Sequence, residues 1–249
     1  FAELEDKTAL RLSEIEEWRK AAELMYIPYD IELGIHPQDD SFLDKERWDL
    51  DNTPPSMFPL LLYHHPLVIY RHQVIKQADV VLAMFLLGQE FPRGQKKRNF
   101  DFYDPLTTGD SSLSVCIQSI VAAELGYLDL AAEYGRYAVL MDLTDVGGNV
   151  KDGCHIASMG GSWMVFVYGF AGLRDHGGQF SFHPSLPKGL KRLRFPLTIG
   201  SSVLEVDITQ QEATYTLQKG ETMTIRHLDE EIDLTQDSRV ATRPLNDSS

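Results

Sequence analysis

The chain has 249 residues, 43% of them hydrophobic, and a formal net charge of -14 at neutral pH. Its length suits one large globular domain, or one domain with a smaller companion, and no apolar run reaches the roughly 20 residues that cross a bilayer. Because a negative surface repels phosphodiester backbones and anionic lipid, the sequence predicts a soluble protein that binds neither nucleic acid nor membrane.

The first 173 residues carry the three- and four-residue apolar repeat of helices. Predicted helices span residues 8–25, 67–87, 110–125, 129–143 and 157–173. Pro66 and Gly88 bracket the second of them, while Asp110 suits the N-cap of the third and Gly126 follows its end. We therefore expect a mainly helical first part.

Residues 28–59 lack sustained periodicity, but the large side chains Phe42 and Trp48 argue against disorder and favour a functional loop. Asp39 and Asp40 either hydrogen-bond a sugar or terminate a turn in this loop. The basic cluster 96–98 is too short to indicate a nucleic-acid site, and we expect it to be a solvated loop.

Beyond His176 the pattern changes to short alternating runs that are typical of strands. Predicted strands cover residues 180–182, 193–195, 203–208, 214–217 and 222–225. We therefore divide the chain into a helical domain over residues 1–176, a β domain over 177–235 and a polar tail over 236–249. The tail is expected to fray.

Cys116 falls in an apolar helical pattern and Cys154 in a Gly-rich turn. Their spacing does not resemble a metal site, so no metal is expected. Two cysteines without a disulfide pattern fit a reducing compartment, and the cytoplasm is the predicted location.

Two predicted helix starts, over residues 107–112 and 155–162, combine small hydroxyl residues or glycines with free backbone N–H groups. Together they could cradle phosphate, because the positive end of a helix favours an anion. His155, just before the second start, could donate to an oxyanion. For either segment alone, however, simple capping and close helix packing is the favoured interpretation.

Several segments, in the same order along the chain, resemble the inverting α-glucoside phosphorylases of glycoside hydrolase family 65, which include maltose, trehalose and kojibiose phosphorylases. The matching segments are 31–40 (IELGIHPQDD), 74–80 (VIKQADV), 107–114 (TTGDSSLS), 120–126 (IVAAELG) and 152–163 (DGCHIASMGGSW). The resemblance covers most of residues 20–235. It implies the later helices of an (α/α)6 barrel followed by a small antiparallel β-sandwich.

The resemblance also implies roles for particular residues. Lys76 and Gln77 resemble the pair that contacts the glucosyl unit, although the spacing of the chain alone leaves open a solvated helix face. The implied phosphate-binding set is Ser111, Ser112, His155, Ser158, Gly160 and Gly161. Inorganic phosphate is the expected co-substrate, and no other cofactor is expected.

Two departures from the family pattern bear on function. Gly109 stands where the family commonly has His, which removes an anion donor. The general-acid Glu of the family belongs to a block upstream of the matching segments, so no catalytic residue is expected in this chain. We expect the N-terminal portion of the protein, or a second copy of the chain, to cover the apolar helix faces.

The leading hypothesis is phosphorolysis of an α-linked glucosyl disaccharide to β-glucose 1-phosphate and glucose, with inversion. An inverting hydrolase needs an acid and a base that activates water, whereas phosphate itself takes the place of that water in a phosphorylase. Alternatives are a glycoside hydrolase on the same scaffold, or a non-catalytic carbohydrate-binding remnant.

Overall fold

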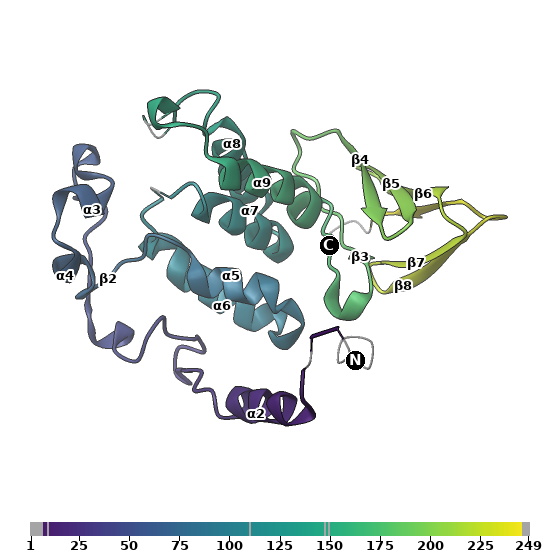
Figure 1. The fold of residues 1–249 in the computed structure, drawn as a ribbon. Helices are drawn as coiled ribbons and strands as arrows, with labels where there is room; N and C mark the ends of the chain where they lie inside the picture. The colour runs from purple at the N-terminus through teal and green to yellow at the C-terminus, as the bar shows by residue number, and fades with distance from the viewer. Residues whose placement is uncertain (1–6, 9, 110, 147, 149, 246–249) are drawn as a thin grey trace.

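The computed structural model describes residues 7–8, 10–109, 111–146, 148 and 150–245. Helices occupy the chain up to residue 170, and small β-sheets follow at the opposite end of the molecule (Figure 1). Among the described residues no helix has the length and apolar character to cross a membrane. The predicted order of helical and β regions is confirmed.

The helical part holds α2 (Leu12–Glu23), α3 (Leu60–Tyr63), α4 (Pro66–Ile69), α5 (Asp79–Leu86), α6 (Arg93–Tyr103), α7 (Ser114–Leu125), α8 (Leu128–Leu140) and α9 (Ile156–Met164). A π-helical turn, η6 (Val165–Phe170), continues α9. Short 3-10 turns are η1 (Phe42–Asp44), η2 (Pro55–Met57), η3 (Gly88–Glu90), η4 (Asp104–Leu106), η5 (Val150–Asp152) and η7 (His176–Gly178).

Helix α7 forms the centre of the helical part. All its residues except Glu124 are buried, and it contacts α5, α6, α8 and α9 (Figure 1). A helix that is apolar on every side is expected to be buried on every side. Gly126 ends it at φ +87°, in the left-handed conformation that glycine adopts without steric strain, as predicted.

The predicted helix over residues 67–87 is wrong, because α4 and α5 are separate. Between them, Ile75 donates its N–H to the carbonyl of Leu106, and its own carbonyl accepts the N–H of Thr108, at 2.9 Å in both cases. Val74 and Ile75 are buried although neither is helical. The apolar residues of this extended buried segment fell at the spacing of a helix, and this led to the wrong prediction.

The other helices match their predictions apart from their ends. Helix α2 is shorter than residues 8–25, and α8 ends three residues before the predicted Leu143. Helix α7 begins at Ser114, after a turn over residues 111–113, and not at the predicted N-cap Asp110, which lies outside the described residues.

The basic cluster 96–98 is not a loop but part of α6, which we did not predict. Lys96 is buried and forms an ion pair with Glu124, at 2.5 Å between Nζ and Oε1. The second oxygen of Glu124 lies 2.7 Å from Nη2 of Arg174. Burial opposes ionisation of Glu124, but Arg174 and Lys96 together hold its pKa below the usual value.

Two sheets form the C-terminal sandwich. Its strands are β3 (Ser181–Phe182), β4 (Arg192–Ile199), β5 (Ser202–Thr209), β6 (Glu212–Lys219), β7 (Thr222–His227), β8 (Glu230–Thr235) and β9 (Val240–Pro244). One sheet has the order β4-β5-β6-β9 and is antiparallel, and the other has the order β3-β7-β8. A separate pair, β1 (Glu46–Arg47) with β2 (His72–Gln73), lies in the helical part.

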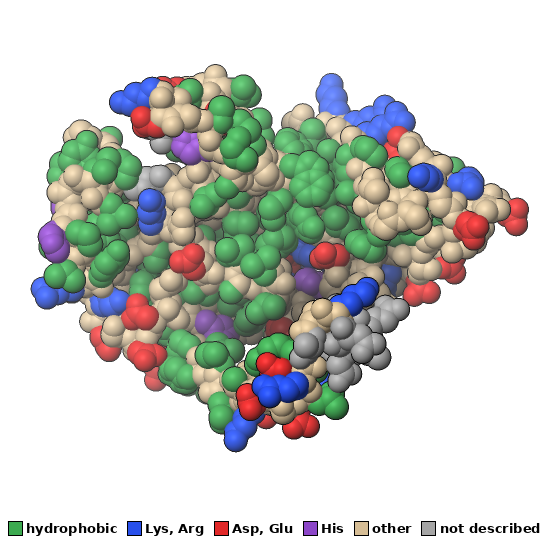
Figure 2. All heavy atoms as spheres, in the orientation of Figure 1, with side chains coloured by type: hydrophobic (Ala, Val, Ile, Leu, Met, Phe, Trp, Pro, Cys, Tyr) green, Lys and Arg blue, Asp and Glu red, His purple; other side chains and the backbone are tan. Residues whose placement is uncertain are grey.

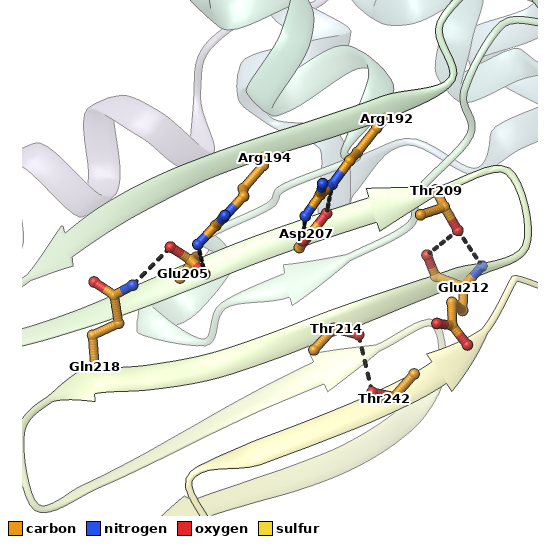
Figure 3. A network of polar contacts seen from close by, with 9 residues as sticks. All are labelled: Arg192, Arg194, Glu205, Asp207, Thr209, Glu212, Thr214, Gln218 and Thr242. Atoms are coloured by element: carbon orange, nitrogen blue, oxygen red, sulfur yellow. Dashed lines mark hydrogen bonds and ion pairs between the residues drawn. The ribbon is translucent and has the colours of Figure 1, made fainter.

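Alternate residues of the sandwich strands point inward, as the two-residue period predicts. The buried members of β5 and β6 are Leu204, Val206, Ile208, Ala213, Tyr215 and Leu217. On the other side of the four-stranded sheet, Arg192 pairs with Asp207, and Arg194 with Glu205, across neighbouring strands (Figure 3). These charges and Pro196 lie on or beside the edge strand β4, where they oppose pairing with another chain.

The predicted fraying of the tail is wrong for residues 240–244. They form β9, which pairs with β6 from Thr216↔Val240 to Glu212↔Pro244. The signal was missed because the exposed Thr242 and the half-buried Arg243 make the strand look polar. The limits of the domains at residues 176 and 235 stay predictions.

A short ribbon joins the helical part to the sandwich. Arg174 and Ser181 exchange both backbone hydrogen bonds at 2.8 Å, and the N–H of His183 donates to the carbonyl of Gly172 at 3.2 Å. Gly172 has φ +64°, and a Cβ atom there would collide with the backbone of His183. Only glycine fits this close antiparallel approach.

Candidate functional site

Three segments that are distant in the sequence meet at the start of α7. The backbone of Ile75 is bonded to Leu106 and Thr108, as described above, and this places Lys76 beside the turn that precedes the helix. The hydroxyl of Ser114 then donates to the carbonyl of Lys76 at 3.0 Å. The predicted sugar-binding and phosphate-binding segments are therefore neighbours.

The starts of α7 and α9 also lie against each other. The hydroxyl of Ser158 donates to the carbonyl of Ser112 at 3.3 Å. A Cβ atom on Gly161 would lie only 2.6 Å from Sγ of Cys116, so the helices approach this closely only because Gly161 has no side chain. Two helix N-termini thus share one region of the surface, which is the geometry an anion cradle needs.

The members of the predicted phosphate set differ in accessibility. Ser111 and Ser158 are 6% and 2% exposed, and the hydroxyl of Ser111 accepts the N–H of Leu113 at 3.4 Å. Ser158 and Gly161 act in packing here, while Ser112, His155 and Gly160 reach the surface. Among the described residues, no acceptor pairs with the backbone N–H of Ala157 or Ser158.

His155 occupies the N-cap position of α9 and is held by Asp142. Its ring Nδ1 lies 2.6 Å from Oδ1 of Asp142, and its backbone N–H donates to Oδ2 at 2.8 Å. These two hydrogen bonds, from the ring first and then from the backbone, hold the pKa of Asp142 below its usual value. Asp142 was not identified from the sequence, because a single Asp at the end of a helix gives no signal of its own.

Lys76 and Gln77 are exposed and line a cavity of about 410 Å³. Further polar or aromatic residues of its wall are Gln38, Asp39, Phe42, Lys45, Tyr70, His72 and Asp79. Within the described residues, no hydrogen bond or ion pair occupies Nζ of Lys76 or the amide of Gln77. Both groups can therefore bind a ligand with hydroxyl groups.

The carboxylate of Asp39 is engaged within its own loop. Its Oδ1 accepts hydrogen bonds from the N–H and hydroxyl of Ser41, and its Oδ2 pairs with Nζ of Lys45 at 2.8 Å. Burial opposes the ionised form, but these bonds hold the pKa of Asp39 below its usual value. Of the two interpretations of the acidic pair, the turn is the one that the geometry of Asp39 favours.

His36 fixes the loop that carries Gln38 and Asp39 to the cavity. Its Nδ1 lies 2.8 Å from the carbonyl of Pro28, and its Nε2 lies 2.7 Å from the amide of Gln95. Because a carbonyl only accepts, Nδ1 carries the proton and Nε2 accepts. A histidine with both ring nitrogens occupied is structural.

The metal-binding amino acids form no group of three or more that could hold an ion within the described part of the chain. The site consists of helix N-termini, hydroxyls, a histidine and an exposed lysine. Such a set can bind an anion beside a sugar, but it contains no pair of carboxylates arranged for acid and base catalysis.

Comparison with known proteins shows the family of the chain. Residues 1–164 match the central catalytic domain of glycosyl hydrolase family 65, and residues 173–234 match the C-terminal domain of that family. The α,α-trehalose phosphorylase of Geobacillus stearothermophilus is 46% identical over 95% of this chain and 31% of its own length. The maltose phosphorylase of Bacillus subtilis is 37% identical over 84% of the chain and 28% of its own length.

A solved structure described as a "putative kojibiose phosphorylase from human microbiome" superposes with a TM-score of 0.85 at 28% identity. It covers 97% of this chain, which in turn covers 33% of that structure. The expected fold class, later helices of an (α/α)6 barrel followed by a small β-sandwich, is confirmed. The chain spans about a third of the length of the relatives that it matches.

Proposed function

Since this chain belongs to glycosyl hydrolase family 65, we propose that the protein of which it forms part cleaves an α-linked glucosyl disaccharide with inorganic phosphate. The products are β-glucose 1-phosphate and glucose, formed with inversion. The observation that carries the proposal is the contact between Ser112 and Ser158 at two adjoining helix starts, with His155 at one start and Lys76 beside the other.

In this proposal phosphate lies at the N-termini of α7 and α9, where Ser112, His155 and backbone N–H groups donate to its oxygens. Lys76 and Gln77 hold the glucosyl unit in the neighbouring cavity. A phosphate oxygen attacks the anomeric carbon from the face opposite the glycosidic oxygen. That bond then breaks, and the departing oxygen takes a proton from a general acid.

We propose that the general acid is supplied by the N-terminal portion of the protein. That portion also covers the apolar face formed by α5, the turn before α7, and α9, where hydrophobic side chains gather in the middle of the view (Figure 2). The exposed members include Leu86, Leu113, Ile156, Met159 and Trp163. The chemistry needs no metal and no organic cofactor, and we assign it to the cytoplasm.

The test uses the full-length protein with α,α-trehalose, maltose and kojibiose, each with and without phosphate. We expect one of them to release β-glucose 1-phosphate and glucose in equal amounts, and only when phosphate is present. Two relatives, at 46% and 45% identity, are named trehalose phosphorylases, so trehalose is the first substrate to assay. Release of two glucose molecules without phosphate would instead establish a hydrolase, and absence of turnover would favour the carbohydrate-binding remnant.

A further inference from the structure

Asp142 joins two elements that flank the phosphate region. It lies just beyond the end of α8, and both of its carboxylate oxygens bond His155, the residue that begins α9. Helices α8 and α9 lie side by side (Figure 1). The Asp142 and His155 side chains are 12% and 25% exposed, so the pair is largely shielded from water.

The bond to the ring of His155 decides which nitrogen carries a proton. An ionised carboxylate has no hydrogen to donate, so Nδ1 of His155 must be the donor. The tautomer of a histidine is set by the partner of one ring nitrogen. Any hydrogen bond between the ring and phosphate is therefore made by Nε2, which donates when the ring carries both protons and otherwise accepts from a phosphate hydroxyl.

If Asp142 only held the connection between α8 and α9 in place, its contact with the ring of His155 would not be needed. Another carboxylate in the same connection, that of Asp145, already accepts the N–H of Val150 at 3.0 Å. The hydrogen bond from the backbone N–H of His155 to Asp142 would be enough to hold the remaining part of this connection. The short bond to Nδ1 acts on the side chain of His155, and it has no role in holding the backbone.

We propose that Asp142 is a positioning residue for phosphate. It fixes the imidazole of His155 with Nδ1 protonated, so that Nε2 is the nitrogen that serves the anion. This inference rests on the proposed function, because it takes His155 as a phosphate ligand. Asp142 itself does not touch substrate.

The kinetic test compares Asp142→Asn with Asp142→Glu and the control Asp145→Asn in the full-length enzyme. Asp142→Asn should raise the phosphate KM about tenfold, as at the lower end of the range for partners that orient metal-ligating histidines, while the disaccharide KM changes less than about twofold. Asp142→Glu, which keeps the carboxylate, should recover part of the loss. Asp145→Asn disturbs the same connection without touching His155, at φ +50°, which Asn tolerates, and should leave the phosphate KM unchanged.

A double-mutant cycle separates positioning from general disruption. In a His155→Ala background, Asp142→Asn should add no further increase in the phosphate KM, because its effect passes through the histidine. Additive losses, or equal rises of both KM values, would overturn the inference. If the parent enzyme shows no phosphate-dependent release of sugar phosphate, the proposed function itself has failed, which is a different result.

A measurement on the unmodified enzyme covers the case in which Asp142→Asn does not fold. Nitrogen-15 NMR of labelled histidine should show the His155 ring protonated at Nδ1, and the His155→Ala variant identifies the signal. A neutral ring protonated only at Nε2 would contradict the assignment.

Discussion

Two neighbouring glycines in α9 have opposite surroundings. A Cβ atom on Gly161 would lie 2.6 Å from Sγ of Cys116, whereas one on Gly160 would have no atom within 4 Å. Gly161→Ala should lower the free energy of unfolding by about 1 to 3 kcal/mol, the range for overpacking. Gly160→Ala should raise it by up to about 1 kcal/mol, because alanine favours a helix.

Urea denaturation of the two variants checks this prediction. Adding Cys116→Ala to Gly161→Ala should restore much of the loss, since it removes the atom that the new methyl group meets. Equal stability of the two single variants would show that α7 and α9 do not approach as closely as described.

At the proposed phosphate site, the prediction concerns Ser112 and His155. If His155 gives a charged hydrogen bond to phosphate, His155→Ala should weaken binding by about 1.5 to 3 kcal/mol, which is roughly a tenfold to hundredfold effect. Ser112→Ala should weaken it less, because a neutral hydroxyl makes a weaker bond. Calorimetric titration of the full-length protein with phosphate provides the measurement, and unchanged affinity in both variants would remove the central support for a phosphorylase.

At the scale of elements, the buried ion cluster joins α6, α7 and the segment after η6. Lys96→Met leaves Glu124 paired with Arg174 alone and should cost about 1.5 to 3 kcal/mol of stability, the range for a hydrogen bond to a charged group. Lys97→Met is the matched control, because Lys97 forms an exposed pair with Asp101 in the same helix. Thermal unfolding should show a lower midpoint for the first variant only, and equal midpoints would contradict the cluster's role.

The two sheets of the sandwich are linked by a buried histidine. Nε2 of His227 lies 3.2 Å from the carbonyl of Pro244 and must carry the proton, so Nδ1 accepts from the hydroxyl of Tyr215 at 2.8 Å. Burial lowers the pKa of His227 below its usual value, although the bond to Pro244 opposes this. The pKa of His183 is also lowered, first by burial and then by Arg174.

The sign of the pH effect follows from these lowered values. As the pH falls below the ordinary histidine pKa, His227 takes up a proton in the unfolded chain before it does so in the folded chain. The contribution of His227 to the free energy of unfolding is therefore complete above about pH 6.5 and is lost as the pH falls further. His227→Gln should reduce the difference in urea midpoint between about pH 7.5 and about pH 5.5. The part of the difference that comes from His183 should remain. An undiminished difference would show that His227 does not contribute.

The elements show how far sequence periodicity reaches. Helices α7 and α8 were predicted within four residues at either end, because Gly126 separates two sustained apolar repeats. Helix α6 was missed, since its consecutive charges conceal that Lys96 is buried beside Glu124. At the site, the two helix starts were predicted, but Asp142 was not, because its partner His155 becomes its neighbour only when α8 and α9 pack together.

For the whole molecule, the apolar face formed by α5, the turn before α7, and α9 determines how the isolated chain is expected to behave. Large apolar patches on soluble proteins mark interaction surfaces, and Ile156 and Trp163 are 72% and 49% exposed here. The chain alone should bind a hydrophobic dye, and should copurify with the N-terminal portion or associate with itself. A monodisperse monomer that binds no dye would contradict this prediction.

A pair of surface variants makes the test specific. Ile156→Asp should reduce dye binding, because it places a charge within the apolar face. Val240→Asp introduces the same charge at an exposed position of β9, far along the chain in the sandwich, and should change dye binding little. Addition of the N-terminal portion should displace the dye from the parent chain.

The ribbon between residues 170–174 and 181–185 bears on how such chains can be rearranged by recombination. A crossover near residue 176, where the composition changes, would take Gly172 from one parent and His183 from the other. Any parent with a larger residue at position 172 would then present a side chain to the backbone of His183. The sandwich should therefore be exchanged between related chains together with both strands of the ribbon, residues 170–174 and 181–185. Chimaeras of related chains should fold best when the crossover precedes Phe170.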